Sequence, residues 1–140
     1  MTFLGKLVKR DRAAAIVEFA LVVPIFVLLV TGIIMFSRAY TRMNALNSAL
    51  RDGARMAATE QYADQPAVQD VIKGRMYQFS SAFGFPIDTS MVVITYVPNA
   101  PDVTVSVTNY PLFAGMNFLG GMQNIQVTKS VVFRHEWSTP

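Results

Sequence analysis

Residues 13–36 read AAAIVEFALVVPIFVLLVTGIIMF, an apolar run whose only charged residue is Glu18. As a helix rising about 1.5 Å per residue, the run is about 36 Å long, enough to cross about 30 Å of hydrocarbon. A charged side chain inside a membrane span costs roughly 2.5–3.5 kcal/mol on insertion scales. The run therefore predicts one transmembrane helix, and we expect Glu18 to have a partner that offsets its cost.

The charges around the run predict how the chain crosses the membrane. Four bases and one acid precede it: Lys6, Lys9, Arg10, Arg12 and Asp11. By the positive-inside rule this flank stays cytoplasmic and the C-terminal part is exported, although Arg38 and Arg42 beyond the run weaken the contrast. Basic segments also bind nucleic acid, but this one is short, adjoins a span and lacks interleaved aromatic residues. We expect no nucleic-acid partner.

Length and composition leave room for one span and one small domain in 140 residues. The later apolar stretches, residues 91–97 and 125–133, are too short and too polar to cross a membrane as helices. The chain has no cysteine, which excludes disulfides, a thiol nucleophile and thiolate metal clusters.

The small residues 13–15 raise the question of a cleaved leader. In a secretory signal the small residues follow the apolar core, whereas here they precede it, and no convincing cleavage site follows Phe36. Small residues between a basic leader and an intact apolar helix indicate cleavage on the cytoplasmic side. The apolar helix would then remain on the mature protein, as in prepilins.

The chain resembles the TadE-like minor pilins, or pseudopilins, of tight-adherence (Tad/Flp, type IVc) pilus systems. Residues 13–24, AAAIVEFALVVP, resemble that family's pattern of a small residue, four variable positions, Glu-Phe-Ala-Leu, two variable positions and Pro. Residues 51–58, RDGARMAA, are similar to the Gly-Ala-Arg-rich helix that follows the span, and the C-terminal half is strand-rich up to residues 134–136.

The resemblance implies a division into a leader at 1–13, a transmembrane helix at 14–36 and an extracytoplasmic pilin-like domain at 37–140. Prepilin peptidase would cut between Ala13 and Ala14, where Ala13 occupies the position usually held by glycine. Glu18 would become the fifth residue of the mature chain and, with Phe19, would set subunit assembly and register. The family pairs this carboxylate with the N-terminal amine of a neighbouring subunit.

Two further readings of the span remain open. Glu18 could instead lie in the headgroup layer, pair with Arg10 or Arg12 and interact favourably with the helix N-terminus. Pro24 lacks the N–H that would bond the carbonyl of Ala20, so we expect a kink there, which either aids extraction into a filament or is an inert bend.

The rest of the chain predicts an α+β domain. The helix is expected to run from Ala14 to about Glu60, because apolar residues recur at steps of three and four: Ala39, Met43, Leu46, Leu50, Ala54 and Ala57. Residues 61–66 read as a loop, and a second helix is expected from Ala67 to about Phe83. Its predicted inward positions are Ala67, Val68, Val71, Ile72, Met76 and Phe79. Strands at 91–97, 103–108 and 125–134, with a turn at 98–101, predict a three-stranded or four-stranded antiparallel sheet.

Two surface features have alternative interpretations. The segment 110–122 is too apolar for an ordinary solvated loop, so it is either a contact surface for other subunits or the membrane, or a segment folded over the sheet. The arginines of the long helix, Arg38, Arg42, Arg51 and Arg55, lie mainly outside its apolar stripe. We interpret them as a solvated face, with a partner patch as the alternative.

Nothing in the sequence favours catalysis. His135 is the only histidine, no nucleophile-elbow pattern occurs, and we expect no metal, no cofactor and no small-molecule substrate. One hypothesis is a minor pilin of the bacterial inner membrane that initiates or anchors an adhesive pilus, with the prepilin peptidase, other pilins and the Tad assembly machinery as partners. The other is an uncleaved, single-span membrane-tethered binding module. The sequence alone does not separate TadE-like from TadF-like subunits.

Overall fold

The computed structural model describes residues 3–62, 64–96, 102–114 and 125–134, and the side chains of these residues from Ala14 onward. The chain divides into two compact units, Met1–Ser37 and Arg38–Pro140. We call them the N-terminal and C-terminal units and describe each by itself. The predicted turn at 98–101 and His135 lie outside the described residues.

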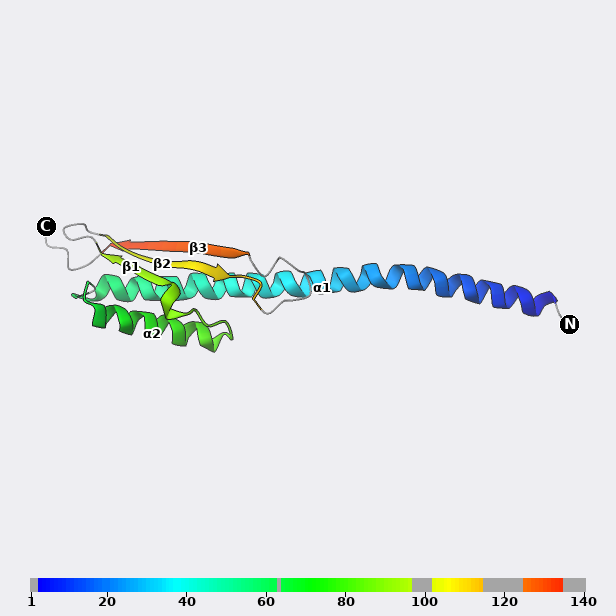
Figure 1. Ribbon diagram of the computed structural model, residues 1–140, viewed down its shortest axis with the longest axis horizontal. Coiled ribbons are helices and arrows are strands. Elements are labelled where there is room, and N and C mark those ends of the chain that lie inside the picture. Colours follow the sequence, from blue (N-terminus) through cyan, green and yellow to red (C-terminus); the bar gives the residue numbers. More distant parts are fainter. Residues whose placement is uncertain (1–2, 63, 97–101, 115–124, 135–140) are drawn as a thin grey trace. The chain divides into compact units, whose positions relative to one another are not determined.

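The N-terminal unit is formed by the first part of helix α1, which runs from Phe3 to Thr59 (Figure 1). The expected start at Ala14 was wrong, because α1 begins eleven residues earlier in the chain. Residues 3–12 contain two Leu, two Lys and two Arg, all good helix formers, so local propensity extends the helix before the apolar run begins. Pro24 lies inside α1, and the predicted kink stays a prediction.

The apolar side chains of this unit are mostly uncovered. Most large apolar side chains between Ile16 and Ile34 are exposed, from 37% at Val30 to 70% at Phe19, and Val23 is half-buried. A helix that is apolar on all sides needs an apolar environment outside the chain. In the described part of the chain, α1 from Ala14 onward is the one helix long and apolar enough to cross a membrane, which suggests membrane anchoring.

The C-terminal unit combines the second part of α1 with one more α-helix and a sheet. Helix α2 spans Pro66–Ala82, a 3-10 turn η1 spans Thr89–Met91, and the strands are β1 (Val92–Tyr96), β2 (Asp102–Pro111) and β3 (Gln126–Arg134). The described strands form an antiparallel sheet in the order β1-β2-β3. This confirms the α+β class and the three-stranded alternative.

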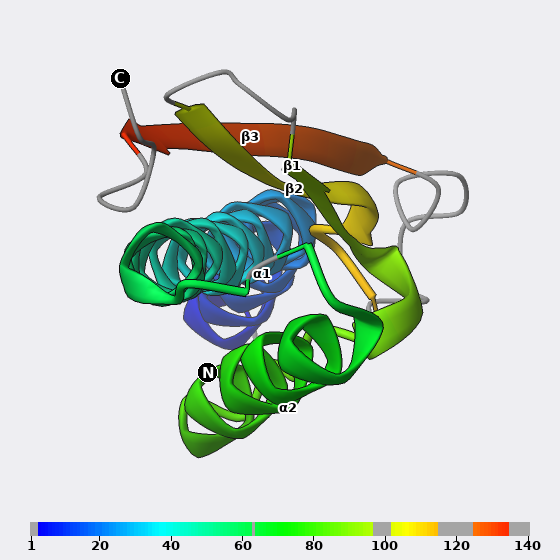
Figure 2. The same cartoon turned by 90° about the vertical axis from the view of Figure 1, so that its left-hand side faces the viewer.

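One core joins these layers. Viewed end-on, the sheet lies on one side of the second part of α1 and α2 on another (Figure 2). The predicted α1 stripe is confirmed, since Leu46, Leu50, Ala54 and Ala57 are fully buried and Ala39 is nearly so. The four fully buried residues cluster with α2 and with strand valines that include Val103, Val105 and Val107. Burying these side chains supplies the main stabilising term of the unit.

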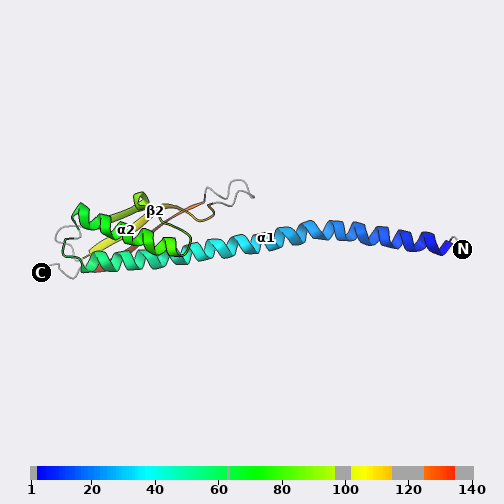
Figure 3. The same ribbon diagram turned by 90° about the horizontal axis from the view of Figure 1, so that it is seen from below.

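The two helices lie side by side, with α2 running back along α1 (Figure 3). A Cβ at Gly53 would overlap Met76 Sδ, so glycine is what lets α2 pack this closely. The inward face of α2 is centred on Ile72 and Met76, which are fully buried. Val71, predicted to face inward, is 64% exposed, because it lies one residue step, about 100°, from Ile72 on the helix.

Strand β2 continues three residues beyond the predicted end at Thr108. The pairing of β2 with β3 is interrupted between Val107 and Tyr110, where Asn109 has φ 56°. Asparagine tolerates this left-handed conformation better than most residues. The irregularity brings Tyr110 to the buried face, where its side chain is 3% exposed.

Candidate functional site

The predicted processing and assembly residues lie together near the start of the apolar run. Ala14, Glu18 and Phe19 are exposed residues of α1, and Glu18 follows Ala14 by four positions. Residues four apart lie one above the other on a helix face, so the Glu18 carboxylate lies one turn from the expected new N-terminus. The alternative partners Arg10 and Arg12, and the side chain of Ala13, are outside the described side chains.

A second cluster, in the C-terminal unit, was not predicted. The guanidinium of Arg42 donates hydrogen bonds to three carbonyl oxygens at the end of β2 and in the turn after it. Nη1 reaches Pro111 O at 3.3 Å and Leu112 O at 3.1 Å, and Nη2 reaches Ala114 O at 2.7 Å. Arg42 is half-buried, so its interpretation as part of a solvated face was wrong. Arg38, Arg51 and Arg55 are exposed as expected.

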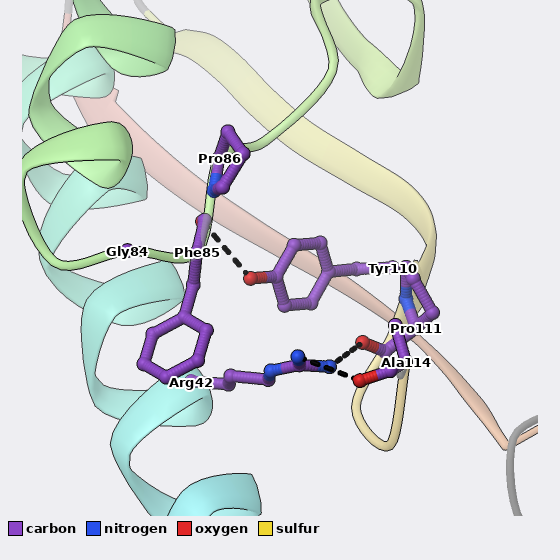
Figure 4. A pocket seen from close by; sticks show the side chains of 7 residues that line it. All are labelled: Arg42, Gly84, Phe85, Pro86, Tyr110, Pro111 and Ala114. Atoms are coloured by element: carbon purple, nitrogen blue, oxygen red, sulfur yellow. Dashed lines mark hydrogen bonds between the residues drawn. The ribbon is translucent and has the colours of Figure 1, made fainter. Parts of the chain in front are cut away.

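Aromatic rings complete the cluster (Figure 4). The guanidinium carbon of Arg42 lies 4.9 Å from the centre of the Phe85 ring, within the range of a cation–π contact. The Tyr110 hydroxyl donates to Phe85 O at 3.2 Å. Burial raises the pKa of Tyr110, and the positive charge of Arg42 opposes that rise. Tyr110 is therefore a neutral hydrogen-bond donor at physiological pH.

These residues line a pocket of about 190 Å³, which we call the Arg42 pocket. Its lining is formed by Arg42, Gly84, Phe85, Pro86, Tyr110, Pro111 and Ala114. Arg42 is the only charged residue among them. The sequence does contain a signal that could have found Arg42. It lies three positions after Ala39 and four before Leu46, so on a helix its side chain is next to the apolar stripe.

The described part of the apolar segment 110–122 is folded inward. Tyr110 and Phe113 are buried, and Leu112 N donates to Ile125 O at 3.2 Å. For residues 110–114 this supports the interpretation of a segment folded over the sheet. Residues 115–122 lie outside the described residues.

Two polar contacts link other elements of the C-terminal unit. Lys129 points inward from β3 and donates to Asn47 Oδ1 on α1 at 3.0 Å. Ser80 at the end of α2 is buried; its hydroxyl donates to Tyr77 O and accepts from Ile87 N at 2.9 Å. Among the described residues no three His, Cys, Asp or Glu side chains gather as a metal site would require.

Comparison with known proteins agrees with the sequence resemblance. Residues 13–55 match the sequence model of the family described as TadE-like protein, which supports a TadE-like protein of Tad pilus systems. The matched range contains Ala13, Glu18, Pro24 and Arg42. No curated protein and no solved structure matches the chain.

Proposed function

We propose that this TadE-like protein is a minor pilin, or pseudopilin, of a Tad/Flp type IVc pilus. It is inserted in the bacterial inner membrane with residues 1–13 in the cytoplasm and the C-terminal unit outside it. Prepilin peptidase removes the leader between Ala13 and Ala14, and the mature chain takes part in initiating or anchoring a pilus used in surface adherence. Its role is structural and requires no catalytic activity.

The observation that carries this proposal is a single acid, Glu18, near the start of an exposed apolar helix, within the range that matches the family. A carboxylate in hydrocarbon is unfavourable by a few kcal/mol, so its retention implies a partner. A protonated amine on a neighbouring subunit would offset that cost. Because an unpaired charge in this environment is costly, the pairing would also select one register between subunits.

The processing step is tested by the mass of the N-terminal peptide, measured on protein extracted from membranes of cells with and without the prepilin peptidase. We expect a start at Ala14 that depends on the peptidase. An intact leader in both strains would overturn the pilin proposal and favour the membrane-tethered binding module.

The cleavage position is tested by placing a bulky residue at the scissile bond and, as a control, the same residue further along the helix. Ala13→Phe should leave the leader uncut, because the cleavage position requires a small side chain. Ala20→Phe makes the same change seven residues further along the same helix and should be processed normally. Equal processing of the two variants would contradict cleavage after Ala13.

The assembly role is tested by Glu18→Gln, which removes the charge and keeps the shape of the side chain. We expect membrane insertion to be retained and pili to be lost, scored by shear fractionation and electron microscopy. Glu60→Gln, the same change outside the apolar run, is the control and should assemble. Normal piliation in the Glu18→Gln strain would sink the assembly role of this carboxylate, whatever the outcome at Ala13.

A further inference from the structure

The donors of Arg42 are only partly used. A guanidinium has five N–H donors, and the carbonyls of Pro111, Leu112 and Ala114 account for three of them. Nε is covered by protein atoms and has no hydrogen-bond partner among the described residues. In any guanidinium, the N–H of Nε and one N–H of Nη2 lie parallel along one edge of the planar group. This is one of the edges that accepts a carboxylate with two parallel hydrogen bonds.

The charge of Arg42 is also unbalanced. An ion pair joins Arg75 to Asp52, whereas Arg42 has no carboxylate partner among the described residues. Its contacts with three carbonyl oxygens and the Phe85 ring are with groups that carry no formal negative charge. A half-buried cation with an unpaired donor is a site where an added acceptor with negative charge gains the most.

The residues that line the pocket indicate which kind of negatively charged group would bind Arg42. Phosphate sites gather several cationic or N–H donors around a doubly charged group, whereas Arg42 is the only cation of this lining. The remaining walls are the Phe85 and Tyr110 rings with Pro86 and Pro111, which suit the methylene groups of a short side chain (Figure 4). A volume of about 190 Å³ accommodates a carboxylate and the carbons that carry it. Because Nε is covered, two-point contact requires a small side-chain adjustment of the wall.

We propose that the Arg42 pocket binds the carboxylate of an aspartate or glutamate side chain from a partner protein. The site lies entirely within the C-terminal unit and does not depend on leader cleavage or on Glu18. Failure of the pilus experiments therefore leaves this proposal intact, and its own failure leaves the pilus role intact.

The first experiment supplies the carboxylate from within the chain. Ala114 lines the pocket, so Ala114→Glu places a carboxylate beside Arg42, and Ala114→Gln is its uncharged match. In full-length protein in mild detergent at pH 7, we expect the Glu variant to melt a few degrees above the Gln variant. The difference should shrink at high salt and at a pH low enough to protonate the carboxylate. A Glu variant that melts at or below the Gln variant would overturn the proposal.

The second experiment uses sodium acetate as the probe. Titration of the ¹⁵N-labelled full-length protein should shift the Arg42 Nε–H signal saturably, and sodium chloride at equal ionic strength should not. In the Ala114→Glu variant the acetate response should be lost, because the site is already filled. No shift with acetate, or an equal shift with chloride, would refute the site. A shift at lower concentration with inorganic phosphate would refute the carboxylate assignment in favour of a phosphate group such as a lipid headgroup.

Discussion

Replacing Gly53 by alanine tests how closely α2 packs on α1. The added Cβ would overlap Met76 Sδ and lie 2.8 Å from Met76 Cγ. Met76 is fully buried, so its side chain has little room to move away. Gly74, in α2, is the matched control, because a Cβ there would meet nothing within 4 Å.

Two opposing terms set the size of the effect. Alanine is favoured over glycine inside a helix by about 1 kcal/mol. Overpacking a core typically costs about 1–3 kcal/mol. At Gly74 only the first term acts, so Gly74→Ala should stabilise the C-terminal unit by up to about 1 kcal/mol. At Gly53 both act, and the net result should be a destabilisation of about 1 kcal/mol.

The assay is thermal unfolding of the full-length protein in mild detergent, followed by near-ultraviolet circular dichroism. For a unit of this size, 1 kcal/mol corresponds to about 4 °C. We expect a lower melting temperature for Gly53→Ala and a higher one for Gly74→Ala. In a Met76→Ala background the overlap is gone, so adding Gly53→Ala should raise the melting temperature. If Gly53→Ala alone raised it as much as Gly74→Ala does, the close-packing argument would be refuted.

Three further predictions concern single side chains. Gly84 has φ +76°, so Gly84→Ala should cost about 1–2 kcal/mol, measured by the same melting assay, and an unchanged melting temperature would contradict this. The backbone N–H and hydroxyl of Ser90 hold the pKa of Asp88 below its usual range. The stability that this lowered pKa gives is present at neutral pH and is lost as the pH falls through the pKa of Asp88 in the folded protein. When the free energy of unfolding is followed into acid, Asp88→Asn should lack this loss. Identical pH profiles of the variant and the unchanged protein would refute the prediction. An inward-facing charge on an edge strand hinders pairing with the edge of another molecule, and Lys129 is such a charge on β3. Lys129→Met should therefore increase self-association, measured by light scattering, whereas Lys73→Met on α2 should not. Equal self-association of the two variants would show that Lys129 does not protect this edge.

Much of the fold was predictable because its signals are local. The α1 stripe, the second helix and the alternating valines of β2 are repeats with periods of 3.6 and 2, and each depends on residues close in sequence. The observed α2 differs from its prediction by one residue at either end. The start of α1 was missed because the sequence pattern marks only where the apolar run begins, while helix propensity continues through the residues before it.

The Arg42 pocket could not be predicted in the same way. The three carbonyls that hold Arg42 are 69 to 72 residues away along the chain. Their position depends on the irregularity at Asn109, which no repeat in the sequence encodes. The sequence pattern placed Arg42 with the arginines outside the stripe, and only the folded chain shows what it binds. The residues predicted to act in assembly are the opposite case, because that prediction rests on a short contiguous motif, which the family match covers.

The two parts of helix α1 should tolerate different kinds of substitution. Between Ile16 and Ile34 its side chains, apart from Glu18, are mostly exposed and apolar, so the polarity of a new side chain should limit substitution more than its size. From Ala39 to Ala58 its inward positions include six buried alanines: Ala39, Ala45, Ala49, Ala54, Ala57 and Ala58. At these positions the volume of a new side chain should limit substitution more than its polarity. Serine is small enough and can hydrogen-bond a carbonyl of the preceding turn, whereas leucine is too large for the space. A deep mutational scan should therefore divide this one helix into two segments with opposite substitution tolerances, and homologous sequences should diverge in the same two ways.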